Sequence, residues 1–420
     1  MRKESTRNEE TGSGVSLTAA AWQSYNQGMI YLDNGATTPL SEQARSAMKP
    51  YLEDLYGNAM AVYRLGAQSR QAVEEARGKI AAVLGTKPEE IYFTSGGTES
   101  DNWAVEIAAA EAGGGHILLS AVEHPAVYNK CMAMKARGFT VELLPVDQEG
   151  QVSPEAAAAA IRPDTILLSV MTANNEVGTI QPISAIAAVA ARENERRRQA
   201  GTAQRLLLHT DAVQAVGHIP CTAASLGIDM LSASAHKFGG PKGAGFLYIR
   251  KGVPVHPLLI GGAQERSMRG GTHNVPGIVG MGAALAEVAA QMDAHMAREK
   301  ALRDRLIDGL RAAVPGCRIN GSLQDRLPGC CHVTMPGVPA ESALFRLDRA
   351  GICASAGSAC EAGAVRPSRT LLAMGQSEEE ARCSLRLTLS YRNTEDEIEE
   401  TVRTLAEIAA SIRALQQEGK

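Results

Sequence analysis

The sequence DMLSASAHKFGGPKGAGFLYIR occupies residues 229–250 of the chain. Its two apolar runs, Met230–Ser232 and Gly245–Ile249, lie on either side of a glycine-rich turn and predict two buried strands. Lys237 follows the first run, and a lysine held in a partly buried pocket has a lowered pKa that suits Schiff-base chemistry. Lys242 is its competitor, but it lies inside a Pro-Lys-Gly turn and is interpreted as exposed or structural.

Short apolar runs and helical patterns alternate outside this stretch, which is typical of an α/β protein with a largely parallel sheet. Further strands of that sheet are expected at Ile91–Thr94, His116–Ser120, Thr140–Leu144, Ile166–Met171 and Arg205–His209. Helices are expected between strands at Asp101–Ala112, Pro154–Ile161 and Ser184–Ala200. Ser153 and Pro154 are a typical N-cap and first helical residue.

The pattern changes after about residue 278. There we expect one long helix, short strands and a last helix with the capping box Thr394-x-x-Glu397, at Val279–Ala313, Arg318–Asn320, His332–Met335, Leu385–Leu389 and Glu395–Gln417. We therefore predict a flexible tail (1–28), a large domain (29–278) whose first residues can pack with the small domain, and a small C-terminal α+β domain (279–420).

The composition favours a globular protein and excludes several functions. The chain has 420 residues and a net charge of −4, which excludes a generally basic nucleic-acid binder. Residues 1–28 lack the apolar core of a signal peptide, and no apolar run reaches the ~18 residues of a membrane span. The eight cysteines and nine histidines show no metal-ligand spacing. We expect a cytoplasmic protein with reduced thiols, no resident metal, and no direct contact with nucleic acid or membrane.

Two further motifs can hold parts of a phosphorylated cofactor. IYFTSGGTES (91–100) reads as a strand, a glycine turn and a helix start, which can bind a phosphate, although an ordinary strand–helix turn explains it equally well. In LLLHTDAVQA (206–215), Asp211 lies just past a buried strand, where open α/β sheets bind ligands; a helix N-cap is the alternative. With Lys237, these motifs supply what pyridoxal phosphate (PLP) needs, because they offer a phosphate seat, a carboxylate for the pyridinium nitrogen and an amine for the aldehyde.

Three more polar residues are candidates for the same site. His124, in SAVEHPAV, offers a ring that can stack on the cofactor and move protons. Asn175, in TANNEVG, and Gln214, shortly after Asp211, are candidate hydrogen-bond donors to the phenolic oxygen of the cofactor.

The motifs together resemble those of a known family. TSGGTESDN, EHPAV, NNEVG, HTDAVQAVG, SAHKFGGPKG, RGGTHNVPGIVG and AGSAC occur in the order and approximate spacing found in cysteine desulfurases, in the NifS/IscS-like branch of the class V aminotransferases. The resemblance covers about residues 30–415. It implies fold type I of the PLP-dependent transferases, with a large domain built on a mostly parallel sheet and a smaller C-terminal domain.

The resemblance also implies a role for individual residues. It makes Lys237 the lysine that binds the PLP aldehyde and Asp211 the partner of the pyridinium nitrogen. The phosphate would be held by Gly97, Thr98, Ser234 and His236, together with Thr272 from the partner subunit of a homodimer. The ring would be contacted by Asn175, Gln214 and His124, and the substrate by Arg386, Asn34 and Asn175, with Arg386 clamping the substrate carboxylate.

Cys360 decides the reaction that the resemblance implies. It lies in GICASAGSACEAGAV (351–365), whose small residues and glycines favour a mobile loop over a helix. A cysteine on such a loop can be reactive, whereas buried cysteines are usually inert. We interpret the other cysteines as buried core residues, namely Cys131, Cys221, Cys317, Cys330, Cys331, Cys353 and Cys383.

The implied activity converts L-cysteine to L-alanine and leaves the sulfur as a persulfide on Cys360. The sulfur then passes to an acceptor such as an iron–sulfur scaffold, whose cluster Cys360 could contact transiently, or a tRNA-thiolation protein. A selenocysteine lyase or another class V PLP enzyme is the alternative. A catalytically silent sulfur-relay binding protein is a third, remote reading.

The chain departs from the family pattern at several positions. A segment that usually reads Gly-Asn-Pro-Ser-Ser-x-His has Ala59, Met60, Ala61 and Tyr63 in place of its Pro, Ser, Ser and His. The other departures are Glu361 after the catalytic cysteine, Val365-Arg366 for Leu-Glu, and the reversed order Tyr391-Arg392. None of them removes a residue implied to hold PLP.

Overall fold

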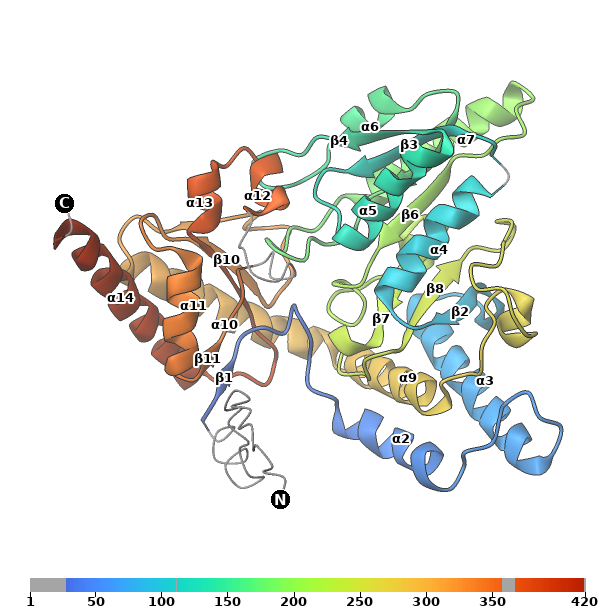
Figure 1. The fold of residues 1–420 in the computed structure, drawn as a ribbon, viewed down its shortest axis with the longest axis horizontal. Coiled ribbons are helices and arrows are strands. Elements are labelled where there is room, and N and C mark those ends of the chain that lie inside the picture. The colour runs from blue at the N-terminus through green and yellow to red at the C-terminus, as the bar shows by residue number, and fades with distance from the viewer. Residues whose placement is uncertain (1–27, 111, 357–366, 419–420) are drawn as a thin grey trace, which may run out of the picture.

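The central sheet lies in the larger part of the molecule (Figure 1). The computed structural model describes residues 28–110, 112–356 and 367–418, and the predicted tail is therefore almost entirely outside the described residues. Seven strands of the described chain form this sheet, in the order β2-β8-β7-β6-β5-β3-β4. Their bounds are β2 (Ile91–Thr94), β3 (Gly115–Ser120), β4 (Phe139–Leu144), β5 (Thr165–Ser169), β6 (Leu207–Asp211), β7 (Met230–Ser234) and β8 (Gly245–Ile249).

The strands pair in parallel except for β8, which is antiparallel to both β2 and β7. The exception has a local cause: the short glycine-rich connection between β7 and β8 holds only the turn η3 (Ala235–Lys237), and a parallel return needs a longer crossover. The predicted α/β class with a mostly parallel sheet is confirmed. Several strand ends differ from the expected ones by one or two residues. The difference that matters for the site is in β6, which begins at Leu207 and includes Asp211 as its last residue.

Helices cover both faces of this sheet (Figure 1). Adjacent β7 residues show it, because Leu231 belongs to one buried apolar cluster and Met230 to another. This two-sided burial explains why the strands read as continuous apolar runs. The covering elements of this part are α2 (Glu42–Glu53), α3 (Arg64–Leu84), η1 (Pro88–Glu90), α4 (Gly97–Ala109), α5 (Pro125–Met134), η2 (Lys135–Arg137), α6 (Pro154–Ala160), α7 (Ile183–Gln199), α8 (Ala223–Leu226), η4 (Gln264–Ser267) and α9 (Val275–Ala290).

A second apolar core holds the C-terminal elements and the first described strand. Ile30 and Leu32 pack in this core with Leu306 and Leu387, and β1 (Ile30–Tyr31) pairs in parallel with β11 (Ile352–Cys353). The remaining elements are α10 (Met292–Ala313), β9 (Arg318–Ile319), β10 (Cys330–Thr334), α11 (Ala340–Arg349), α12 (Arg369–Ala373), α13 (Glu378–Arg382), β12 (Ser384–Thr388) and α14 (Glu395–Glu418), with β10 antiparallel to β9 and β12. The domain limits at residues 28 and 278 stay predictions.

The expectation of one long helix over Val279–Ala313 is wrong. The structure has two helices, α9 and α10, which meet at Gln291 with a bend of 73°. The two helices bury their apolar faces in different cores, since Leu285 packs in the large core and Leu306 in the second. A straight helix cannot reach both, so the chain turns between them.

Other local predictions are confirmed. Ser153 caps α6 with Pro154 at its first position. Thr394 and Glu397 form the predicted capping box, since each accepts a hydrogen bond from the other's backbone N–H. As for membranes, no single helix among the described residues is long and apolar enough to span one, and the bent pair α9–α10 passes that test only by length and composition.

Candidate active site

A cavity of about 180 Å³ lies where the carboxyl ends of β6 and β7 meet the start of α4. Its walls bring together nine residues that the sequence singled out: Gly97, Thr98, His124, Asn175, Asp211, Gln214, Ser234, His236 and Lys237. The other lining residues, which sequence reasoning missed as site residues, are Asp101, Met171 and Val213. Parallel strands expose their carboxyl ends at one edge of a sheet, which explains how motifs so far apart in the chain meet here.

One end of the cavity has the features of an anion seat. Gly97 is the first residue of α4, so its N–H and those of Thr98 and Glu99 come before the first hydrogen bond of the helix and have no intrahelical partner. The absence of a side chain at Gly97 is required, because a Cβ there would lie 2.7 Å from Val213 Cγ2. Ser234 is buried beside it, and burial, followed by the charges of Lys237 and Lys242, lowers the pKa of His236 to about 4. The His236 ring is therefore a neutral hydrogen-bonding group at neutral pH.

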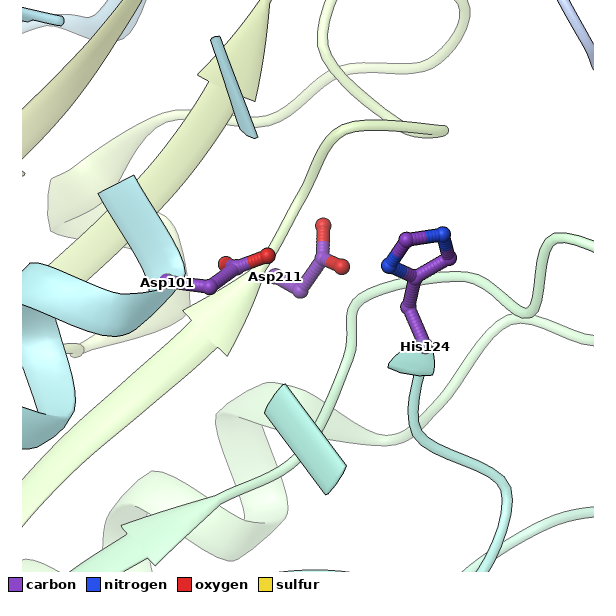
Figure 2. Close-up of side chains that lie close together, drawn as sticks. All are labelled: Asp101, His124 and Asp211. Carbon is purple, nitrogen blue, oxygen red and sulfur yellow. The ribbon is translucent and has the colours of Figure 1, made fainter. Parts of the chain in front are cut away.

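Asp211 and His124 lie at the middle of the cavity and face one another (Figure 2). Asp211 is only 4% exposed, and its Oδ1 accepts a hydrogen bond of 2.9 Å from the N–H of Val213. Burial raises the pKa of Asp211, while His124, this N–H and Lys237 act in the opposite direction. His124 also caps α5, since its Nδ1 accepts from the N–H of Ala126 at 3.2 Å. The neutral ring therefore carries its proton on Nε2.

Lys237 lies on η3, directly after β7, and lines the cavity. Its Nζ donates hydrogen bonds to the carbonyl oxygens of Gly35 at 2.6 Å and Ala36 at 2.8 Å. Gln214 Nε2 donates to the same Gly35 oxygen at 3.0 Å. The segment LDNGATT is thus bound to two side chains of the cavity wall, Lys237 and Gln214.

Arg386, the expected substrate clamp, adjoins the cavity without lining it. From β12, its Nη1 donates to the carbonyl oxygen of Asn175 at 2.7 Å and its Nη2 to Asp33 Oδ1 at 2.9 Å. Its Nε is buried and has no hydrogen-bond partner among the described residues. Asn34 does not line the cavity either, and its Nδ2 donates to the carbonyl oxygen of Thr388 at 2.9 Å. Asp33 carries no sequence signal of this role beyond its place in LDNGATT.

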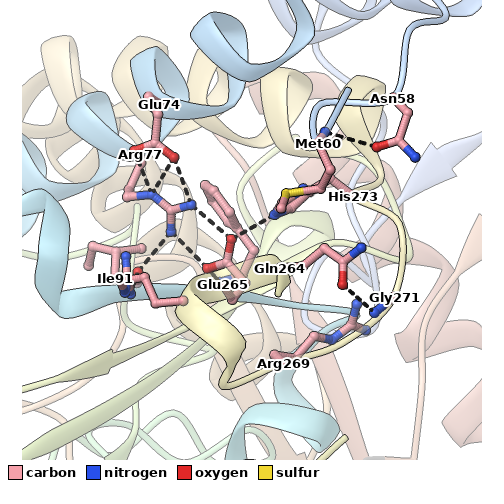
Figure 3. Close-up of polar contacts among 12 residues, drawn as sticks. Asn58, Met60, Glu74, Arg77, Ile91, Gln264, Glu265, Arg269, Gly271 and His273 are labelled. Atoms are coloured by element: carbon pink, nitrogen blue, oxygen red, sulfur yellow. Dashed lines mark hydrogen bonds and ion pairs between the residues drawn. The ribbon is translucent and has the colours of Figure 1, made fainter. Parts of the chain in front are cut away.

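Thr272 lies outside this cavity, in a second cavity of about 230 Å³, and is exposed. Its neighbour His273 donates from Nε2 to Glu265 at 2.9 Å, and Arg77 donates to both Glu265 oxygens at 2.8 Å (Figure 3). Although burial opposes it, these bonds lower the pKa of Glu265 to about 2. The backbone of Glu265, Arg266 and Ser267 has positive φ of 45°, 59° and 67°. The Arg77–Glu265 pair links the segment that leads to Thr272 to α3, and the reach of Thr272 into a partner subunit stays a prediction.

Cys360, Glu361 and Arg366 lie outside the described residues, so the structure places none of them. The first residues after this gap are bound to the cavity wall. Ser368 donates to a carboxylate oxygen of Glu176, next to Asn175, and Arg369 Nη1 donates to the carbonyl oxygen of Ala121 at 2.6 Å.

The remaining departures and cysteines have plain structural surroundings. Tyr391 stacks on His295 with ring centroids 3.7 Å apart, and Met60 and Tyr63 are exposed.

The expected burial holds for Cys131, Cys221, Cys330, Cys331 and Cys383. It is wrong for Cys317 and Cys353, which are only half-buried; Cys317 packs against the edge of the second core, and Cys353 is the last residue of the short strand β11.

Residues 30–401 match the family described as aminotransferase class V. The chain belongs to this family. Cysteine desulfurase IscS from Methanosarcina thermophila is 46% identical over 386 residues, which are 91% of this chain and 93% of that relative. A solved NifS-like protein superimposes with a TM-score of 0.84 at 36% identity, covering 91% of this chain and 99% of its own. SspA in complex with cysteine superimposes with a TM-score of 0.75 at 32% identity, covering 87% of this chain and all of its own.

These relatives confirm the resemblance to the cysteine desulfurases within the class V family. Enzymes of this branch use PLP, and the residues of the cavity fit that cofactor. The start of α4 offers free N–H groups, Asp211 offers a buried carboxylate, and Lys237 offers an amine on the same cavity.

Proposed function

We propose that this class V enzyme binds PLP in the cavity and converts L-cysteine to L-alanine, passing the sulfur to Cys360. The observation that carries the proposal is the meeting of Lys237, Asp211 and the start of α4 on one cavity. Relatives named cysteine desulfurase over most of the chain support the reaction.

The cofactor would be held by the residues that line the cavity. Its phosphate would lie against Gly97, Thr98, Ser234 and His236, with Thr272 supplied by the partner subunit of a homodimer. Its ring would contact Asp211, Asn175, Gln214 and His124, and its aldehyde would bind Lys237. Bound PLP supplies an electron sink that stabilises negative charge on the substrate carbon next to the amine.

Arg386 would bind the carboxylate of L-cysteine, with Asn34 and Asn175 beside it. The unpartnered Nε of Arg386 is a buried donor that an incoming carboxylate oxygen would satisfy. The bonds to Asn175 and Asp33 hold the guanidinium plane in place for this contact. A relative bound to cysteine supports the choice of substrate.

The proton and sulfur transfers would use three side chains. Lys237 Nζ takes the proton from the carbon next to the substrate amine, and His124 takes the proton of the substrate thiol. The Cys360 thiolate then bonds to the substrate sulfur as the carbon–sulfur bond breaks, with the electron pair of that bond left on the substrate. The carbon that carried the sulfur takes the proton held by His124, and the carbon next to the amine regains the proton held by Lys237, which gives alanine. The products are L-alanine and a persulfide on Cys360, so no external oxidant is needed for this half of the reaction.

The test is alanine formation from L-cysteine with a thiol reductant present, comparing the wild type with Cys360→Ala. We expect alanine from the wild type only. Equal alanine from both would overturn the role of Cys360 and favour a lyase, and turnover of selenocysteine would then separate a selenocysteine lyase from other class V enzymes. PLP bound without turnover of either substrate would favour the sulfur-relay protein. The acceptor, an iron–sulfur scaffold or a tRNA-thiolation protein, is left for transfer assays with the Cys360 persulfide.

A further inference from the structure

Asp101 is a buried acid on the wall of the proposed PLP site, with no role in the chemistry described above. It lies on α4, one turn after Gly97, and is 1% exposed. It lines the cavity, and its Oδ1 has no hydrogen-bond partner among the described residues. A buried carboxyl oxygen without a partner is unfavourable, so its retention beside the site needs an explanation.

Asp101 lies close to a second buried acid, Asp211. One polar side-chain atom of each of Asp101, Asp211 and His124 lies within 4.8 Å of the other two. In the close-up, Asp211 lies between Asp101 and His124, and the carboxyl group of Asp101 points toward Asp211 (Figure 2). Two carboxyl groups this close in a buried site do not both ionise, so one of them holds a proton.

The surroundings decide which carboxyl group holds the proton. Asp211 is surrounded by groups that stabilise its negative charge. The N–H of Val213 donates to it, and His124 and Lys237 lower its pKa. These groups favour the ionised form of Asp211.

Asp101 faces no cation from the elements packed against α4. Its titratable neighbours are Asp211 and His209 from β6, Glu123 and His124 at the start of α5, and Cys131 on α5. Burial lowers the pKa of His124, so its ring is neutral at neutral pH. His209 lies 3.6 Å from Asp101 Oδ1, and burial lowers the pKa of His209 to about 3, so this ring is neutral. Burial and the charge of Asp211 raise the pKa of Asp101 well above its usual range, against a hydrogen bond from Ser232.

We propose that Asp101 is a positioning residue that stays protonated and gives Asp211 a hydrogen bond in place of a second negative charge. Asp211 is then the one carboxylate anion at the middle of the cavity. The identity of its ligand, the ring nitrogen of PLP, rests on the proposed function. A hydrogen bond from a neutral acid stabilises the Asp211 carboxylate and keeps it ionised at neutral pH, which the pairing with a protonated ring nitrogen requires.

The first test compares Asp101→Asn with Asp101→Ala. Asparagine is neutral, has nearly the same shape and keeps an N–H donor, whereas alanine removes the donor. We expect the dissociation constant of PLP from the full-length chain to stay within about threefold of the wild type in D101N and to rise about tenfold or more in D101A. The visible absorbance of the bound cofactor should keep its pH dependence in D101N and change it in D101A.

Two outcomes of this test overturn the proposal. Equal, wild-type affinity in both variants means that Asp101 does not act on Asp211. Equal loss in both means that the negative charge or the exact carboxyl shape matters. Circular dichroism and thermal unfolding establish that each variant is folded before its affinity is compared.

Infrared difference spectra between wild-type and D101N holoenzyme test the protonation state directly. At pH 7.5 the wild type should show the C=O stretch of a protonated carboxyl group that D101N lacks. Loss of carboxylate bands instead would overturn the proposal. This readout does not depend on turnover: if the wild type forms no alanine the proposed function fails, yet the infrared result still decides the state of Asp101.

Discussion

At the scale of single residues, the site depends on how a few side chains are held. Lys237 donates to two backbone carbonyls of the LDNGATT segment, so its amine is fixed at the cavity wall instead of extending into solvent. Lys242 lies five residues further along the same turn and is exposed. The structure therefore separates two lysines that the sequence motif places side by side.

We expect Lys237→Ala to abolish the visible absorbance of lysine-bound PLP, since no other described lysine lines the cavity. Lys242→Ala is the matched control and should keep both the absorbance and alanine formation. An absorption spectrum of each purified variant checks this. A lysine-bound band that persists in K237A, or is lost in K242A, would contradict the assignment.

At the scale of the element, the start of α4 and the course of α10 matter most. α4 begins with a glycine that packs against Val213, and this close approach brings the helix start to the cavity. α10 carries Glu299, a nearly fully buried acid whose Oε1 accepts from the N–H of Tyr391 at 3.1 Å. A substitution in α4 tests how packing affects PLP binding, and a substitution in α10 tests how burial affects the stability of the protein.

Gly97→Ala should weaken the binding of PLP. The new Cβ would lie 2.7 Å from Val213 Cγ2 and displace that side chain toward the cavity. An off-rotamer side chain costs about 0.5–1.5 kcal/mol, which corresponds to a dissociation constant for PLP raised roughly 3- to 10-fold.

Gly78→Ala on α3 is the control for this substitution, because a Cβ there meets nothing within 4 Å. It should leave PLP binding unchanged and raise the free energy of unfolding by about 0.5–1 kcal/mol, since alanine favours the helix. Fluorescence titration with PLP and urea unfolding measure the two quantities. Unchanged PLP affinity in G97A would mean that Val213 can move away without cost.

Glu299→Gln should stabilise the protein at pH 8. Burial raises the pKa of Glu299 to about 7 from its ordinary 4.5, although the N–H of Tyr391 opposes the shift. The folded state therefore holds a proton that the unfolded state releases, and this contribution to stability is present below pH 4.5 and lost as the pH rises to 7. Glutamine does not ionise, so E299Q does not lose this stability as the pH rises. We expect its free energy of unfolding at pH 8 to exceed that of the wild type by about 1–3 kcal/mol.

Urea unfolding of wild type and E299Q at pH 5 and pH 8 measures the effect of this substitution. The difference should be largest at pH 8 and much smaller at pH 5, where Glu299 keeps its proton in the folded state. An equal difference at both pH values would show that packing, and not ionisation, separates the two proteins.

At the scale of the whole molecule, two segments expose large apolar residues. The connection between α2 and α3 exposes Tyr56, Val62 and Tyr63, and Ile260 is also exposed in the segment that leads to Thr272. Exposed apolar residues that gather on a globular protein are typical of an interface. We propose that these two segments meet the partner subunit of a homodimer, which would also bring Thr272 to the partner's site.

The double variant Val62→Asp, Ile260→Asp should dissociate the homodimer, because each change buries a charge if the interface forms. Val62 is 96% exposed and Ile260 90% exposed in the single chain, so the fold itself should be unaffected. Phe345→Asp, on α11 in the other part of the molecule, is the control for surface charge. Sedimentation velocity should give a monomer for the double variant and a dimer for F345D. A dimer in both would place the interface elsewhere.

Most of the site was predictable because each of its parts is local. A glycine turn before a helix, an aspartate at a strand end and a lysine before a glycine turn each report their chemistry in residue type and spacing alone. Asp101 and Asp33 escaped prediction for the opposite reason. Nothing in their own neighbourhoods indicates that Asp101 faces Asp211, or that Asp33 pairs with Arg386 across 353 residues.

The sequence by itself determined the strands of the large sheet, the PLP motifs and the family, because apolar periodicity and short motifs are properties of neighbouring residues. The tertiary structure alone decided three matters: the bend at Gln291, the hydrogen bonds that hold LDNGATT against Lys237, and the burial of Asp101 beside Asp211. Each of these depends on contacts between distant parts of the chain. Such contacts are set by how the layers pack and which core a helix face joins, and local periodicity carries no record of either.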